Sequence, residues 1–133
     1  MSVDLGIDLG TVKSRVVLPE KGIIFEQPTI VAYDKRAKKI IAIGVEAEEL
    51  IGKTPEDIEI TKPIKNSVLS NYRATESLLR FMIGEAVGKF TLVKPYVVLS
   101  VPSVITSVEK RALEEAALNA GAGEVFLYPT SFL

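Results

Sequence analysis

The sequence contains no cysteine and no histidine. It therefore cannot form disulfides, use a thiol or an imidazole in catalysis, or bind zinc through the usual ligand sets. Any chemistry must come from carboxylates, hydroxyls, lysine, arginine and the backbone.

Long apolar runs and an excess of basic charge are also missing. No run approaches the roughly 18 residues of a membrane span, and the first residues lack the pattern of a secretory signal. We therefore expect a cytoplasmic protein. The 16 Lys and Arg residues are balanced by 17 Asp and Glu residues, and no local basic stripe is evident, so nucleic acid is not an expected partner.

What is present is the composition of one soluble globular domain. The chain has 133 residues, of which 47% are hydrophobic and 25% are charged. Apolar residues alternate over residues 3–8 and resume at 15–18 and 23–25, which predicts a three-stranded antiparallel meander. Strands at 29–33 and 39–43 and a short helix at 46–51 predict a small α+β insert.

The second half of the sequence changes its period. An amphipathic pattern predicts a helix over residues 72–88 that ends at Gly88. The nearly continuous apolar run at 96–101 predicts a strand buried on both faces of a sheet. A capping-box pattern begins a helix at Thr106, and Gly121 is its expected stop before a last strand at 125–127. The fold class is α/β of the mixed α+β type.

The segment most informative about function is 8–14, Asp-Leu-Gly-Thr-Val-Lys-Ser, which joins two predicted strands. A tight turn lets backbone N–H groups converge on phosphate oxygens, and the Thr11 and Ser14 hydroxyls and the Lys13 ammonium can add donors. Asp8 would be repelled by phosphate unless a cation intervenes, so its expected role is to hold hydrated Mg²⁺. On spacing alone, an ordinary hairpin with a polar tip is the commoner interpretation.

A resemblance favours the functional interpretation. Residues 4–14 resemble the opening hairpin of the superfamily of actin, sugar-kinase and heat-shock-chaperone ATPases. Further segments are similar, in order and spacing, to the MreB/Mbl type of bacterial actin-like protein: 26–32, 43–47, 52–55, 62–65, 101–106 and 121–122. The resemblance covers about residues 4–127. A division-type or chaperone-type member of the superfamily fits the turn but not the later segments.

The resemblance implies the N-terminal half of an actin-like ATPase, with a mixed β-sheet flanked by helices and an insert subdomain at about 32–65. Whole proteins of this family bind ATP with Mg²⁺ in an interdomain cleft and form membrane-associated filaments that organise cell-wall synthesis. By position, the phosphate-binding residues are Gly10, Thr11, Val12, Lys13 and Ser14. Asp8 faces Mg²⁺ through water.

The sequence also departs from the family pattern. Val12-Lys13 stands where the family usually has Ala-Asn. Asn66-Ser67 stands where the family often has Asp-Gly, and Asn71 stands where it often has Asp at the start of the long helix. The carboxylate that positions the attacking water, the second phosphate loop and the nucleoside pocket have no counterpart in the 133 residues. We therefore name no catalytic residue, and expect weak or absent binding of ATP and Mg²⁺ and no hydrolysis by the chain alone.

Two functions remain open at this point. The first is a truncated or partial MreB-like, ATP-binding filament protein involved in rod-shape determination and cell morphogenesis. The alternative is a noncatalytic half-domain that caps or regulates an intact actin-like homologue. Expected partners are a second copy or such a homologue, with peripheral membrane contact through Phe90 and Leu92 as a further interpretation, although Leu92 more often would begin a buried strand.

Overall fold

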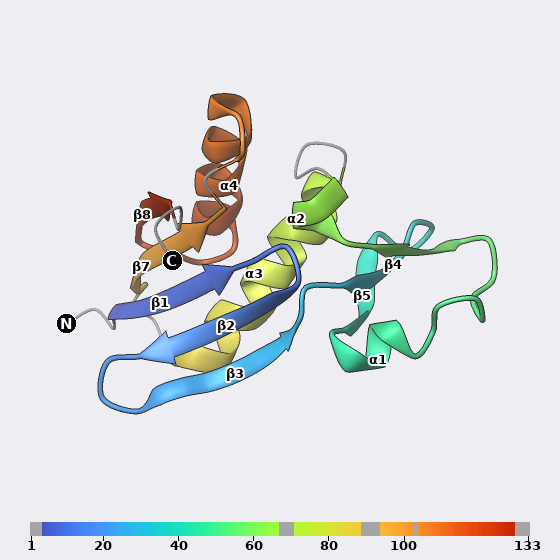
Figure 1. Ribbon diagram of the computed structural model, residues 1–133, viewed down its shortest axis with the longest axis horizontal. Helices are drawn as coiled ribbons and strands as arrows, with labels where there is room; N and C mark the ends of the chain where they lie inside the picture. The colour runs from blue at the N-terminus through green and yellow to red at the C-terminus, as the bar shows by residue number, and fades with distance from the viewer. Residues whose placement is uncertain (1–3, 67–70, 89–93, 103, 130–133) are drawn as a thin grey trace.

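The computed structural model describes residues 4–66, 71–88, 94–102 and 104–129. Its larger sheet has the strand order β3-β2-β1-β7-β8 and its smaller sheet the order β5-β4-β6 (Figure 1). The strands of the larger sheet are β1 (Asp4–Leu9), β2 (Lys13–Leu18), β3 (Gly22–Pro28), β7 (Tyr96–Val101) and β8 (Glu124–Pro129). Those of the smaller sheet are β4 (Val31–Asp34), β5 (Lys39–Ile43) and β6 (Ile58–Thr61). The helices are α1 (Val45–Glu48), α2 (Pro63–Asn66), α3 (Tyr72–Val87) and α4 (Ser107–Asn119).

The larger sheet is mixed. β1, β2 and β3 form the antiparallel meander expected from the alternating sequence, whereas β7 and β8 join β1 in parallel. A parallel partner requires a crossover connection, which here is supplied by the smaller sheet and α3 before β7, and by α4 before β8. This arrangement confirms the expected mixed α+β fold.

Both long helices begin and end on local sequence signals. The Asn71 side chain accepts a hydrogen bond from the Ala74 N–H at the start of α3. Thr106 and Glu109 form the predicted reciprocal capping box at the start of α4. Gly121, at φ 121°, lets the chain turn so that the Ala122 N–H bonds the Ala117 carbonyl and closes the helix. Gly88, at φ 81°, ends α3 and donates its N–H to the Gly84 carbonyl. The predicted helix limits at Gly88 and Gly121 are therefore confirmed.

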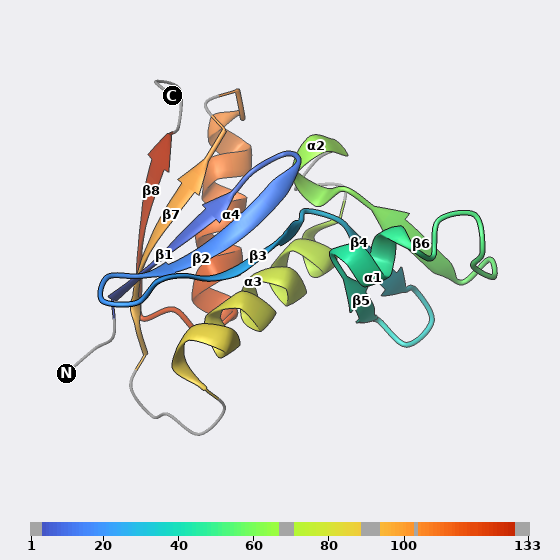
Figure 2. The same cartoon turned by 60° about the horizontal axis from the view of Figure 1, so that its bottom comes forward.

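The two long helices cover the same face of the larger sheet (Figure 2). The covered side chains, the apolar stripes of α3 and α4, and a few residues of β4 and α2 make one buried core. Its fully buried large side chains are Leu5, Ile7, Leu9, Val16, Val31, Leu78, Leu79, Met82, Val97, Leu99 and Leu113. Because alternate strand residues point to opposite faces, the other residues of each strand lie on a face that these helices do not cover.

That uncovered face overturns one prediction from sequence. β7 lies inside the sheet between β1 and β8, but it is not buried on both faces, since Val98 is 38% exposed. On β8, Phe126 and Tyr128 are 51% and 53% exposed. The apolar run of β7 was therefore a correct signal for a strand and a wrong signal for two-sided burial.

The smaller sheet has its own apolar cluster of Ile30, Ala32, Ala42 and Ala47. Its helix covers Val45–Glu48 rather than 46–51, and the strand expected at 29–33 covers Val31–Asp34. β6 and α2 were not predicted. The assignment of 32–65 as a separate subdomain stays a prediction, and so does the membrane contact, because Phe90 and Leu92 lie outside the described residues. No helix in the described ranges is long and apolar enough to cross a membrane.

Candidate functional site

The turn between β1 and β2 is closed by a backbone hydrogen bond. The Gly10 N–H donates to the Lys13 carbonyl oxygen at 3.2 Å. A Cβ atom at position 10 would lie 2.6 Å from that same oxygen, which is closer than real Cβ atoms come to backbone. The turn therefore requires glycine at position 10.

Within the described part of the chain, two adjacent backbone N–H groups at the tip of this turn have no acceptor. Neither Thr11 nor Val12 donates its N–H to any residue in the described part of the chain. Both residues are exposed, and the Val12 side chain is 78% accessible. Adjacent, unpaired N–H groups in a turn are a donor set that suits phosphate oxygens.

The tip is supported from inside by residue 29. The Thr29 N–H donates to the Val12 carbonyl at 2.8 Å, and the hydroxyls of Ser14 and Thr29 are hydrogen-bonded at 2.6 Å. Ser14 is only 1% exposed. Its hydroxyl therefore holds the turn instead of being displayed at the tip. Sequence reasoning did not identify Thr29 as a support of the turn. Its position directly after Pro28 was the one feature of the sequence that could have drawn attention to it.

Lys13 is exposed, and its ammonium group forms an ion pair within the chain. Its Nζ lies 3.8 Å from a carboxylate oxygen of Glu26 on β3, and the Arg15 Nε donates to the same oxygen. The hydrogen bond from Arg15, followed by the charge of Lys13, lowers the pKa of the Glu26 carboxyl. Sequence reasoning missed both Arg15 and Glu26.

Asp8 lies near the end of β1, opposite Arg15 on β2 and Ser100 on β7. Its carboxylate makes no ion pair or side-chain hydrogen bond with another described residue. Within those residues no three acidic side chains gather into a metal-sized cluster. A single unpaired carboxylate beside free backbone N–H groups would suit Mg²⁺ that keeps most of its waters, and would not suit a cage made by protein ligands alone. The role of Asp8 toward Mg²⁺ stays a prediction.

A hollow of about 430 Å³ opens beside the turn. It is lined by the turn, α2, the segment that leads into α4 and the first turn of α4: Thr11, Val12, Ile64, Lys65, Pro102, Val104, Ile105 and Glu109. Lys65 places a positive charge beside this hollow, which the residues with the free N–H groups, Thr11 and Val12, also line. The structure therefore places Thr11, Val12 and Lys65 around one hollow. Asp8 and Gly10 do not line it, but they lie at the same end of the sheet, where β1 leads into the turn.

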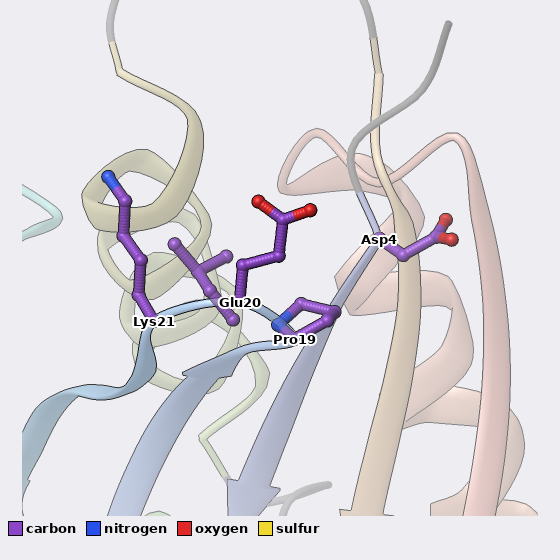
Figure 3. A pocket seen from close by; sticks show the side chains of 5 residues that line it. Asp4, Pro19, Glu20 and Lys21 are labelled. Carbon is purple, nitrogen blue, oxygen red and sulfur yellow. The ribbon is translucent and has the colours of Figure 1, made fainter.

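A second hollow, of about 380 Å³, lies at the opposite end of the sheet, where β2 turns into β3. Figure 3 shows Glu20 and Lys21 extending beyond the strand ends and Asp4 pointing away to one side. Ion pairs between these charged groups are absent from the described contacts. This end resembles an ordinary solvated turn.

Comparison with known proteins places the chain in a family. The model of the MreB/Mbl protein family matches residues 2–133. The chain is 38% identical over 124 residues to the cell shape-determining protein Mbl of Bacillus cereus, and 37% identical over 131 residues to the cell shape-determining protein MreB of Escherichia coli. These matches cover 93% and 95% of the chain but only 37% and 38% of the relatives. The chain thus spans little more than a third of their length.

Solved structures agree with this assignment. MreB 5 of Spiroplasma citri bound to AMPPNP is similar over 97% of this chain and 39% of its own, with a TM-score of 0.80 and 27% identity. The MamK double helical filament shares the fold, with a TM-score of 0.73 over 97% of this chain and 41% of its own at 20% identity. The resemblance seen in the sequence is thereby confirmed, and the chain belongs to the MreB/Mbl family of actin-like, cell shape-determining proteins.

Proposed function

We propose that this chain forms the phosphate-binding side of a nucleotide site in an MreB/Mbl-type filament protein. The turn at 10–13 receives the phosphates of ATP or ADP, and Asp8 faces the hydrated Mg²⁺ that accompanies them. The observation that carries the proposal is the pair of unpaired N–H groups at Thr11 and Val12 beside an unpaired carboxylate. A related MreB of Spiroplasma citri is known bound to AMPPNP and to ADP, which supports a nucleotide as the ligand.

Each residue of the proposed site has its own role. The Thr11 and Val12 N–H groups bind and orient the phosphate oxygens, and Gly10 gives the backbone the close approach that the turn needs. Bound Mg²⁺ would neutralise phosphate charge, and Asp8 would hold its water shell. Ser14 and Thr29 keep the turn fixed from inside. Because these donors lie on one side of a ligand, we expect a dissociation constant weaker than about 10 μM, which is roughly 7 kcal/mol of binding free energy.

The test is calorimetric titration with Mg²⁺ and AMPPNP on wild type, Asp8→Asn and Asp4→Asn. Asp4 is a matched control because it is an exposed carboxylate at the other end of the same strand. We expect Asp8→Asn to weaken Mg²⁺-dependent binding by about tenfold and Asp4→Asn to leave it unchanged. Equal affinity in all three proteins would remove Asp8 from the site.

A second candidate function, association with another actin-like subunit, is favoured by the uncovered sheet face. Val98, Phe126 and Tyr128 put three large side chains on it at 38–53% exposure. Burying an apolar side chain of this size contributes about 1.5 to 3 kcal/mol. We propose that a second copy of the chain covers this face, which would give the chain a binding role that needs no hydrolysis.

A further inference from the structure

The charged residues around Asp8 lie in one row across the larger sheet. The strand register places Tyr128, Ser100, Asp8, Arg15 and Glu26 directly beside one another on β8, β7, β1, β2 and β3. Residues in register point to the same face of a sheet. Arg15 therefore lies between two carboxylates, Asp8 on one side and Glu26 on the other.

Arg15 could reach either carboxylate, because side chains directly opposite on antiparallel strands have Cβ atoms about 4.5–5.5 Å apart. In the structure its guanidinium contacts Glu26 and makes no ion pair with Asp8. Lys13 also directs its ammonium to Glu26, at 3.8 Å. Glu26 thus contacts both cations of β2, and the Asp8 carboxylate has no ion pair with any residue that the structure describes.

We propose that Glu26 is a positioning residue that holds Arg15 away from Asp8 and so leaves Asp8 available to a hydrated divalent cation. The part played by the cation rests on the proposed function above. The positioning of Arg15 does not rest on that function, because it concerns only which of the two carboxylates Arg15 contacts. β3 is the other neighbour of β2, so a carboxylate on β3 can draw Arg15 away from β1. Without Glu26, Asp8 would be the one carboxylate in register with Arg15.

The variant Glu26→Gln tests this because glutamine keeps the size of the side chain and removes its charge. Arg15 then has Asp8 as the one carboxylate in register with it, and we expect it to turn there. An arginine on Asp8 would compete with Mg²⁺ for the same oxygens. Under this proposal Glu26 affects metal binding at Asp8, although Glu26 lies on β3, two strands away from β1 in the sheet.

The first readout is the NMR signal of the Arg15 Nε–H group, which needs no nucleotide. We expect this signal to differ between Glu26→Gln and the double variant Glu26→Gln/Asp8→Asn, because Arg15 donates to Asp8 only in the former. In wild type and Asp8→Asn the signal should be nearly the same. Identical Arg15 signals in Glu26→Gln and its double variant would overturn the proposal, and a general change of local charge would not produce the expected pattern.

The second readout is the Mg²⁺ concentration that half-saturates ADP binding. We expect Glu26→Gln to raise it by about two- to fivefold, the range of an exposed ion pair, and Arg15→Gln/Glu26→Gln to restore it. Arg15→Gln alone should leave it near the wild-type value. A double variant that stays impaired would contradict the proposal. If wild type shows no Mg²⁺-dependent binding, the proposed function fails, and the Arg15 signal alone decides the positioning role.

Discussion

At the scale of single residues, Gly10 and Glu26 show two ways in which a side chain shapes the turn. Gly10 matters because of the atoms it lacks, since a Cβ would meet the Lys13 carbonyl at 2.6 Å. Glu26 matters through charge, because it gathers Lys13 and Arg15 on the β3 side of the hairpin. Neither effect involves the buried core.

Gly10→Ala should therefore destabilise the chain by about 1–3 kcal/mol, because the new Cβ must push the turn apart. Gly84→Ala is the matched control. Gly84 lies inside α3 with nothing within 4 Å of its added Cβ, so it should gain up to about 1 kcal/mol from helix propensity. Urea denaturation measures both changes. A Gly10→Ala protein as stable as wild type would show that the turn relaxes freely.

The ion pairs of Glu26 should make a small, pH-dependent contribution to stability. Arg15 and then Lys13 lower the folded-state pKa of Glu26 below its ordinary value of 4.5. A carboxyl with a depressed pKa stabilises the folded state above the unfolded pKa and loses that effect as pH falls through the folded pKa. The stability difference between wild type and Glu26→Gln should thus be full above the unfolded pKa near 4.5, decline as pH falls below that value, and be lost once pH has passed the lower folded-state pKa.

Thermal melts of both proteins between about pH 3 and pH 7 measure this difference. A gap between the two melting curves that stays constant over the whole range would mean that glutamine costs stability by packing and not by charge.

At the scale of elements, local signals in the sequence were sufficient for the meander, α3 and α4. The capping box at Thr106 and the glycine at 121 are visible within a few residues, so both limits of α4 could be predicted. β6 could not, because Ile58–Thr61 has four residues and becomes a strand by pairing with β4, far away in sequence. Two-sided burial of β7 was mispredicted because periodicity does not reveal which face the helices cover.

In the candidate site, too, some features could be predicted from the sequence and others could not. The turn at 8–14 was found from its glycine and flanking strands. The pairing of Arg15 with Glu26 was not, because it depends on the register of β2 and β3, which shifts at a bulge between Val16 and Val17. A bulge adds a residue to one strand, so counting along the sequence places the partner wrongly.

Thr106→Ala should cost about 1 kcal/mol, because the side chain accepts the Glu109 N–H and shares the capping box. Ser107→Ala, one residue later and exposed, makes a matched control that should change stability little. Chemical denaturation of the two variants distinguishes loss of the cap from a general effect of alanine at the helix start. Equal stabilities would contradict a role for the cap.

At the scale of the whole molecule, one face of the larger sheet is packed by helices, and no helix of the described ranges covers the other. A row of partly exposed apolar side chains on an open sheet face favours pairing with another protein surface. The larger sheet thus carries both features of interest, since Asp8 and Phe126 lie on the same open face by their register with β7.

Self-association through that face should weaken when its apolar surface is reduced. Phe126→Ser should shift the association equilibrium toward monomer, whereas Ile51→Ser, equally exposed but beyond the larger sheet, should not. Sedimentation equilibrium over a hundredfold range of protein concentration measures this. A wild-type chain that is strictly monomeric over that range would contradict the expectation.

The most direct test of the nucleotide site is the amide NMR spectrum of the chain during titration with Mg²⁺ and ADP. The account predicts saturable shifts of the Thr11 and Val12 N–H signals, because these are the two unpaired donors at the tip. The Gly52 signal, from an exposed turn beside the smaller sheet, should stay in place. Thr11 and Val12 signals that do not move at millimolar nucleotide, or that move no more than that of Gly52, would contradict it.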